Sequence, residues 1–217
     1  MKIQIFSDSL ALPREAPQKV YYEETYPAKL QKDHIVVQFS KGAGTIDELF
    51  GQTFYLKMFS PDVVIIQSGI VDCAPRPFTQ FEEHFFKLNF VTKGCKAILK
   101  RVTKPWLRNL RKVAWTSPKK FRFYCNQFFE IYPNIPIYAI GILPPRPEYE
   151  KMAKGISKRI AQYNSILKDV FRENFIDTSD MPDEGIMSDH HHMTTVGHQF
   201  IYDKIVERLS KLPANPK

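Results

Sequence analysis

Four histidines and an aspartate crowd the segment "GIMSDHHHMTTVGH" at 185–198. Imidazole and carboxylate groups at this spacing suit three kinds of site: a metal centre, a general base with its orienting acid, or a polar turn rich in histidine. Adjacent side chains are expected to diverge, and no Cys, Asp or Glu pattern completes a zinc site. We therefore expect no metal and no other cofactor, and the rest of the chain must show whether a base is present.

Short β-branched runs alternate with longer helical patterns along the chain. The near-continuous apolar runs at 2–6, 34–39, 62–67 and 135–143, with a weaker one at 175–179, predict strands covered on both faces by helices. The helical patterns lie at 45–59, 147–174 and 195–212, the last with Ile201, Ile205, Val206 and Leu209 on its apolar stripe. This alternation predicts a parallel sheet between two helical layers in one domain spanning 1–217.

In such folds the functional groups gather where parallel strands end and loops begin. Four polar segments occupy these places, namely "SDSLALPR" at 7–14, "SKGAGTIDEL" at 40–49, "SGIVDCAPRP" at 68–77 and "SDHHHMTTVGH" at 188–198. The sheet should therefore bring them to one edge.

Taken together, these segments resemble the four short blocks of the SGNH or GDSL hydrolase superfamily, in the family's order. Asp8-Ser9-Leu10 matches the first block, with Ser7 where the family usually has glycine, and Asp189-His190-His191-His192 matches the last. The resemblance spans nearly the whole chain and implies a flavodoxin-like α/β/α sandwich with a five-stranded parallel sheet.

The chemistry of this family explains the residue types. A serine hydroxyl is a weak nucleophile unless an imidazole accepts its proton, and the imidazole needs a third group that fixes its tautomer. The resemblance assigns these roles to Ser9, His192 and Asp189. His190 and His191 are then surplus surface histidines, and His198 should pack in or near the last helix.

Acyl transfer also needs hydrogen-bond donors for the developing oxyanion. The resemblance supplies the backbone N–H of Ser9 and that of a glycine in "KGAGT", for which Gly42 fits best and Gly44 is the alternative. The third block departs from the family's Gly-x-Asn-Asp, because Val71 stands at the asparagine position and has no side-chain donor. Either the oxyanion hole is smaller, or another donor such as Arg76 has been recruited.

Four residues near these blocks are expected to contact substrate: Asp8, Gly69, Asp72 and Arg76. The planar guanidinium of Arg76 is suited to an anionic substrate group, although a salt bridge to Asp72 is equally compatible with the sequence. The segment "GIVDCAPR" resembles a bacterial subgroup encoded with surface-polysaccharide biosynthesis enzymes. It implies an esterase, deacetylase or O-acyltransferase acting on an acylated saccharide, with a non-catalytic SGNH-like binding or scaffolding protein as the competing class.

Charge is concentrated in a helical insertion at roughly 76–133. Between 76 and 134 there are thirteen Lys and Arg against three Glu, a local excess of +10 in a chain whose total is +8. Within it, the basic segment 95–123 interleaves cations with aromatic side chains. An amphipathic cover for the sheet, an anionic membrane surface and an anionic substrate all suit this composition, whereas no recognised module favours nucleic acid.

Cysteine usage and the absence of long apolar runs indicate the cellular compartment of the protein. The three cysteines (Cys73, Cys95 and Cys125) have no CxxC spacing and should be free and mostly buried. The first residues lack a signal-peptide layout, and no apolar run approaches the roughly 20 residues that span a bilayer. We expect a cytoplasmic protein, with the basic segment able to place it at the inner face of the membrane.

Overall fold

A five-stranded parallel sheet forms the centre of the computed structural model, which describes residues 1–88 and 104–212. The strand order is β2-β1-β3-β4-β5, and every neighbouring pair is parallel. The strands are β1 (Lys2–Ser7), β2 (Ile35–Ser40), β3 (Val63–Gln67), β4 (Ile137–Ile140) and β5 (Phe175–Ile176). All five predicted strands are confirmed, and β5 is the shortest of them.

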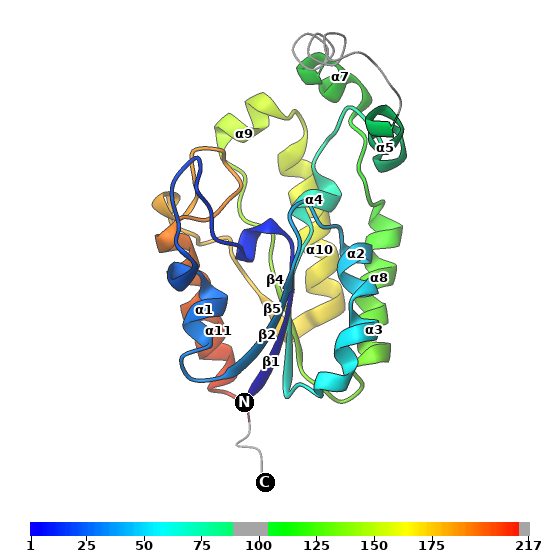
Figure 1. Cartoon of the computed structure of the whole chain (residues 1–217). Helices are drawn as coiled ribbons and strands as arrows, with labels where there is room; N and C mark the ends of the chain where they lie inside the picture. The colour runs from blue at the N-terminus through cyan, green and yellow to red at the C-terminus, as the bar shows by residue number, and fades with distance from the viewer. Residues whose placement is uncertain (89–103, 213–217) are drawn as a thin grey trace.

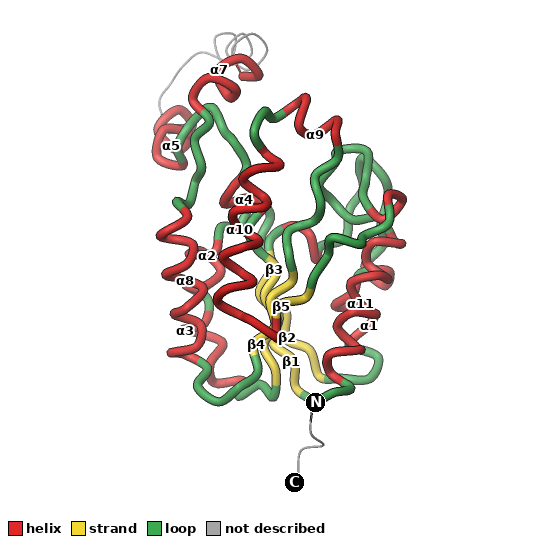
Figure 2. Tube along the Cα trace, turned by 180° about the vertical axis from the view of Figure 1, so that it is seen from behind, coloured by secondary structure: helices red, strands yellow, loops and turns green. Residues whose placement is uncertain are grey.

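Helices cover both faces of the sheet (Figures 1 and 2). One face carries α1 (Tyr26–Leu30) and α11 (Thr195–Leu209). The other carries α2 (Ile46–Gly51), α3 (Thr53–Leu56), α8 (Pro118–Ile131) and α10 (Ile156–Phe171). Because every residue of β3 and β4 is buried, these strands need apolar side chains on both faces, which explains their continuous apolar runs. The predicted three-layer α/β/α sandwich is therefore confirmed.

The last helix follows the predicted stripe with one exception. Ile201, Ile205 and Leu209 are buried, but Val206 is 38% exposed. Positions 201, 205 and 209 repeat every four residues and face the core, whereas 206 is rotated away from them. His198, at 1% exposure, packs in this helix as expected, and its Nδ1 accepts a hydrogen bond from the backbone N–H of Tyr26 at 3.3 Å.

The helical pattern predicted at 147–174 is divided in the structure. It forms α9 (Pro147–Met152) and α10, which meet at Gly155 with φ 89°. Glu150 stabilises the break, because its carboxylate accepts from the backbone N–H groups of Gly155 and Ser157 at the start of α10. The predicted helical pattern thus contains two helices, and Gly155 is the residue that permits the left-handed turn between them.

The described residues of the basic insertion form two structurally different parts. Helix α8 belongs to the covering layer, since Phe121, Cys125 and Phe128 are fully buried. In contrast, α5 (Gln80–Leu88) and α7 (Lys104–Arg111) lie beyond the end of the sheet, on the same side as α9 (Figure 1). Cys73 and Cys125 are free and buried as expected, and Cys95 lies outside the described residues.

Across residues 1–88 and 104–212, no helix combines the length and the apolarity that crossing a membrane requires.

Candidate active site

The four polar segments meet at the carboxyl end of the sheet, as the strand pattern predicted. Ser9 begins a short 3-10 turn, η1 (Ser9–Ala11), two residues after β1 ends. The segment at 188–192 precedes α11, whose N-cap Thr194 accepts from the backbone N–H of Gly197. Parallel strands end at one edge, so residues distant in the sequence are brought close together there.

Ser9, His192 and Asp189 form one continuous hydrogen-bonded chain. The Oγ of Ser9 lies 3.0 Å from Nε2 of His192, and Nδ1 of His192 lies 2.6 Å from Oδ2 of Asp189. Because an ionised carboxylate only accepts, His192 donates from Nδ1, which leaves the lone pair of Nε2 facing the serine hydroxyl. The structure therefore brings together the three residues that the sequence singled out, with the imidazole in the tautomer that a base requires.

The carboxylate of Asp189 is held in place by its own turn. It also accepts from the backbone N–H groups of His191 at 3.2 Å and His192 at 3.0 Å. Burial alone would raise the pKa of Asp189. The hydrogen bond from the His192 ring, the nearby His191 and the His192 N–H outweigh it, so the pKa lies well below its usual range. Asp189 is therefore ionised at neutral pH and can stabilise a charged imidazolium.

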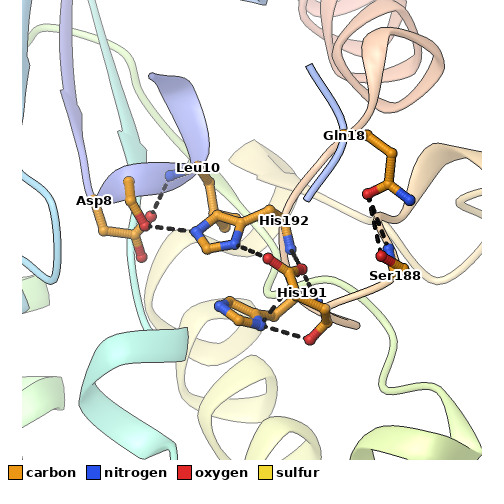
Figure 3. A network of polar contacts seen from close by, with 8 residues as sticks. Asp8, Leu10, Gln18, Ser188, His191 and His192 are labelled. Carbon is orange, nitrogen blue, oxygen red and sulfur yellow. Dashed lines mark hydrogen bonds and ion pairs between the residues drawn. The ribbon is translucent and has the colours of Figure 1, made fainter. Parts of the chain in front are cut away.

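Asp8 is fully buried, and its carboxylate caps η1. Its Oδ1 accepts from the N–H of Leu10 at 2.9 Å (Figure 3), and its own N–H donates to the carbonyl of Gln67 on β3. Burial, as the largest cause, raises the pKa of Asp8 to about 7. The buried carboxylate thus fixes the turn that carries the nucleophile, and its burial gives no support to the predicted substrate contact.

Ser7 shows how the chain accommodates a residue where the family has glycine. It ends β1 in a buried position, and its Oγ lies 2.9 Å from the carbonyl of Asp8 and 2.7 Å from Oγ of Ser40 at the end of β2. The extra hydroxyl joins the ends of two neighbouring strands.

Asp72 is also fully buried, and it connects the second block to the third. Its carboxylate accepts from the backbone N–H of Ile46, the first residue of α2, and from the hydroxyl of Ser68. Burial raises its pKa to about 6, against the lowering effect of these hydrogen bonds. The carboxylate anchors the loop that precedes α2, and its burial gives no support to the expected substrate contact.

Gly42 is the better of the two candidate glycines for the oxyanion hole. Gly42 is exposed, whereas Gly44 is buried and its N–H donates to the carbonyl of Lys41. Among the described residues, no protein group accepts a hydrogen bond from the N–H of Ser9 or of Gly42. Both N–H groups therefore lack an internal acceptor in the described residues, and their role as oxyanion donors stays a prediction.

The third block contributes backbone geometry. Gly69 has φ 130° and precedes α4 (Ile70–Cys73), and a Cβ placed on it would lie 2.6 Å from Cδ1 of Ile142. Only glycine fits this close approach. Val71, at 6% exposure, packs into the core and presents no donor. Gly69 is therefore required for packing against Ile142, and its predicted contact with substrate stays a prediction.

Arg76 packs against the insertion and does not form the salt bridge to Asp72 that the sequence left open. Its guanidinium carbon lies 3.7 Å from the ring centroid of Trp115, and one of its NH₂ groups donates to the carbonyl of Val71 at 3.4 Å. No salt bridge to Asp72 is found in the part of the chain that the structure describes. The cation–π contact holds Arg76 against the insertion.

His191 does not behave as a surplus surface histidine. Its ring stacks on Tyr149 with centroids 5.6 Å apart, and its centroid lies 4.1 Å from that of His192. Figure 3 shows the two rings side by side. Burial, followed by the charge of His192, lowers the pKa of His191. The expected divergence of neighbouring side chains fails because His190 has a left-handed backbone with φ 69°.

Two further residues belong to the surroundings of the site. Arg14 is partly exposed, and its charge acts on Asp189 and on Asp8. It ends the polar segment after the first strand, so its position in the sequence could have indicated that it lies near the site. Tyr149 lies on α9, far along the chain from any block, and no sequence signal pointed to it.

A small apolar recess adjoins the histidines. It encloses at most about 190 Å³, a volume that includes the solvent at its mouth. Its lining consists of Ile70, Ile142, Leu143, Tyr149, Ile160, His190 and His191. Within its walls the recess leaves no room for a water molecule, so a group enters it only if the lining side chains move.

Several solved structures with a similar fold are described as lipases or esterases. A lipase/acylhydrolase from Enterococcus faecalis aligns over 100% of this chain and 99% of its own with a TM-score of 0.67 at 14% identity. The acetyl xylan esterase AlAXEase aligns over 96% of this chain and 100% of its own, with a TM-score of 0.62 at 16% identity.

A member of the lipolytic G-D-S-L family from Veillonella parvula aligns over 97% of this chain and 99% of its own, with a TM-score of 0.61 at 10% identity. No protein-family model and no curated protein matches the sequence. The comparisons therefore establish architecture over the full length: this chain has the fold of the GDSL lipolytic hydrolases.

Proposed function

We propose that the chain is a serine-dependent ester hydrolase of the SGNH/GDSL type. The observation that carries the proposal is the hydrogen-bonded chain from Ser9 through His192 to Asp189, assembled from segments more than 180 residues apart. A serine that only caps a turn, or a histidine that only lies on the surface, would not be expected to form this ordered chain of hydroxyl, imidazole and carboxylate. The similar lipases and esterases support the same reaction class.

The reaction follows from the positions of the donors and acceptors. Nε2 of His192 takes the Ser9 proton as Oγ attacks the ester carbonyl, and the carbonyl oxygen becomes an oxyanion beside the N–H groups of Ser9 and Gly42. The tetrahedral intermediate then expels the alcohol, which receives the proton from the imidazolium. The resulting acyl-enzyme is attacked by water, or by a sugar hydroxyl if acyl transfer occurs, with His192 again accepting and returning the proton.

For the substrate we propose an acylated saccharide carrying a short acyl group. The recess beside the histidines has a mostly apolar lining but almost no free space, so a short acyl chain would enter it only after side-chain movement and a long one would not fit. The acetyl xylan esterase among the similar structures acts on an ester of this kind. With the resemblance of "GIVDCAPR" to polysaccharide-associated proteins, we infer a deacetylase or O-acyltransferase in surface-polysaccharide biosynthesis.

One observation favours a second candidate, a non-catalytic binding protein. Val71 is buried and apolar at the position where the family has the asparagine donor. Loss of one oxyanion donor typically costs a factor of 10² to 10³ in kcat. A protein with only two donors could retain the fold and a saccharide site without useful turnover.

Covalent labelling distinguishes the two candidates. A fluorophosphonate reacts with an activated serine without requiring the natural substrate, so the wild type should be labelled on Ser9, as located by peptide mass spectrometry. Ser9→Ala should lose the label, and Ser179→Ala, which removes an exposed hydroxyl elsewhere, should keep it. A wild type that resists the probe under conditions that label a known serine esterase would contradict the hydrolase and favour the binding protein.

The substrate proposal requires a separate measurement. We expect the polysaccharide, or its lipid-linked precursor, to differ in acyl content between cells that carry wild-type protein and cells that carry Ser9→Ala. Mass spectrometry of the two preparations would show this change. Identical acyl content would exclude the saccharide as substrate and leave the serine chemistry standing.

A further inference from the structure

Three metal-ligating side chains converge on one point at the edge of the site. They are Asp189, His191 and His192, and one ligand atom from each lies within 4.8 Å of the other two. Nδ1 of His191 is 3.6 Å from Oδ1 of Asp189, and Nδ1 of His192 is 2.6 Å from Oδ2. Tetrahedral Zn²⁺ with bonds of 2.0–2.2 Å places its ligand atoms about 3.3 Å apart, so modest rotations of the three side chains suffice.

We propose that this triplet is an inhibitory site for Zn²⁺, with the carboxylate and two imidazoles as ligands and water in the fourth position. The inhibitory effect rests on the proposed esterase function, whereas the binding does not. His191 is the residue that distinguishes this site from an ordinary triad, because the acid and base alone offer two ligands. Its position over Tyr149 keeps the ring close to the carboxylate.

Tautomer chemistry explains why metal binding would stop catalysis. In the free protein His192 donates from Nδ1 to Asp189 and faces Ser9 with the lone pair of Nε2. When Zn²⁺ takes the lone pair of Nδ1, the neutral ring must carry its proton on Nε2. The proton moves from one nitrogen to the other, and Nε2 becomes a donor toward Ser9 that cannot accept the serine proton.

Two features of the site limit the affinity. The ring of His191 donates from Nδ1 to the backbone carbonyl of Asp189 at 2.9 Å, and this hydrogen bond must break for Nδ1 to bind the metal. The nearby charge of Arg14 also opposes a cation at Asp189. We therefore expect a reversible site of moderate affinity, suited to respond to free metal, in place of a permanently loaded structural centre.

Calorimetric titration with ZnCl₂ tests the binding without reference to activity. The wild type should bind one Zn²⁺, and His191→Phe, which keeps a ring against Tyr149 but cannot ligate, should bind it at least tenfold more weakly. His84→Gln, which removes an exposed histidine on α5, should bind as the wild type does. Equal affinity in the wild type and His191→Phe would overturn the proposal.

Two further measurements separate this inference from the proposed function. Ser9→Ala should retain wild-type Zn²⁺ affinity because Ser9 supplies no ligand, and a large loss would contradict the assigned ligand set. Fluorophosphonate labelling of the wild type should be suppressed over the concentration range in which calorimetry shows binding. For His191→Phe, the suppressing concentration should rise at least tenfold. Binding without suppression would refute the inhibitory role while leaving the metal site intact.

Discussion

Asp189→Asn is the substitution that most directly tests the role of the carboxylate. The asparagine oxygen can still accept from the backbone N–H groups of His191 and His192, now at 3.2 and 3.0 Å from Oδ1. The turn should therefore survive. In place of Oδ2, however, the amide presents an NH₂ group to Nδ1 of His192, at a position 2.6 Å away.

The magnitude follows from this exchange of acceptor for donor. An NH₂ group stabilises the tautomer in which Nδ1 carries the lone pair, so the proton sits on Nε2 and cannot be displaced by that of Ser9. The same change in a serine protease triad lowers kcat by about 10⁴. At about 1.36 kcal/mol for each factor of ten, the barrier should rise by about 5 kcal/mol.

The assay is the rate of fluorophosphonate labelling at neutral pH, with thermal unfolding measured in parallel. Asp180→Asn is the matched control, since Asp180 pairs with Lys204 on the surface, where an ion pair contributes little. The control should label at the wild-type rate. A labelling rate of Asp189→Asn within tenfold of the wild type, with an unchanged Tm, would refute the reasoning. Nitrogen NMR of His192 gives an independent readout, because the protonated nitrogen should change from Nδ1 to Nε2.

Four further outcomes are expected. The pKa of Asp8 is about 7 in the folded protein against an ordinary 3.8. The protonated carboxyl therefore contributes stability that is fully present below pH 3.8 and is lost as the pH rises through 7. Asp8→Asn cannot ionise, so the free energy of unfolding of this variant, measured in urea, should rise relative to that of the wild type by about 4 kcal/mol between pH 3.5 and pH 8. A difference between the two proteins that does not change with pH would contradict the buried ionisation. Val71→Asn adds a side-chain amide at the family's donor position and should raise kcat for an aryl acetate at least tenfold, whereas an unchanged rate in a folded variant would place the oxyanion elsewhere. Leu143→Phe narrows the apolar recess, so the ratio of butyrate to acetate ester hydrolysis should fall; a constant ratio would remove the recess as the acyl site. Reversal of the exposed Lys112 and Lys119 to glutamate should weaken co-sedimentation with anionic vesicles at low salt and leave the aryl acetate rate unchanged, and a wild type that ignores such vesicles would exclude the membrane interpretation.

The cations in and near the basic segment have different surroundings in the structure. Arg111 forms a two-pronged salt bridge with Glu82, and Arg108 donates to the carbonyl of Met152. Lys112 is exposed, and Lys100 and Arg101 lie outside the described residues. Part of the charge in the insertion is thus used for internal contacts, so the variants above use exposed lysines.

The sequence by itself determined the features that depend on local pattern. Continuous apolar runs predicted the buried strands because both faces of a central parallel strand need apolar cover. The spacing of Asp189 and His192 placed acid and base within one turn, so their contact required little from the rest of the fold. The order of the polar segments after successive strands predicted a shared edge, and the structure brings Ser9 to it.

Tertiary structure decided what each side chain meets at that edge. Asp8 and Asp72 look like substrate ligands in the sequence, but the packing of the sheet against its helices buries both and gives them neighbouring N–H groups to bind. The sequence allowed Arg76 to pair with Asp72, and the fold of the insertion places its guanidinium over Trp115.

The convergence of His191 on Asp189 depends on one left-handed residue and on a tyrosine from α9. Neither could be read from local pattern, since side-chain direction in an irregular turn is set by the backbone torsions and by long-range packing. For that reason the sequence predicted a catalytic triad, and the structure alone revealed its neighbours.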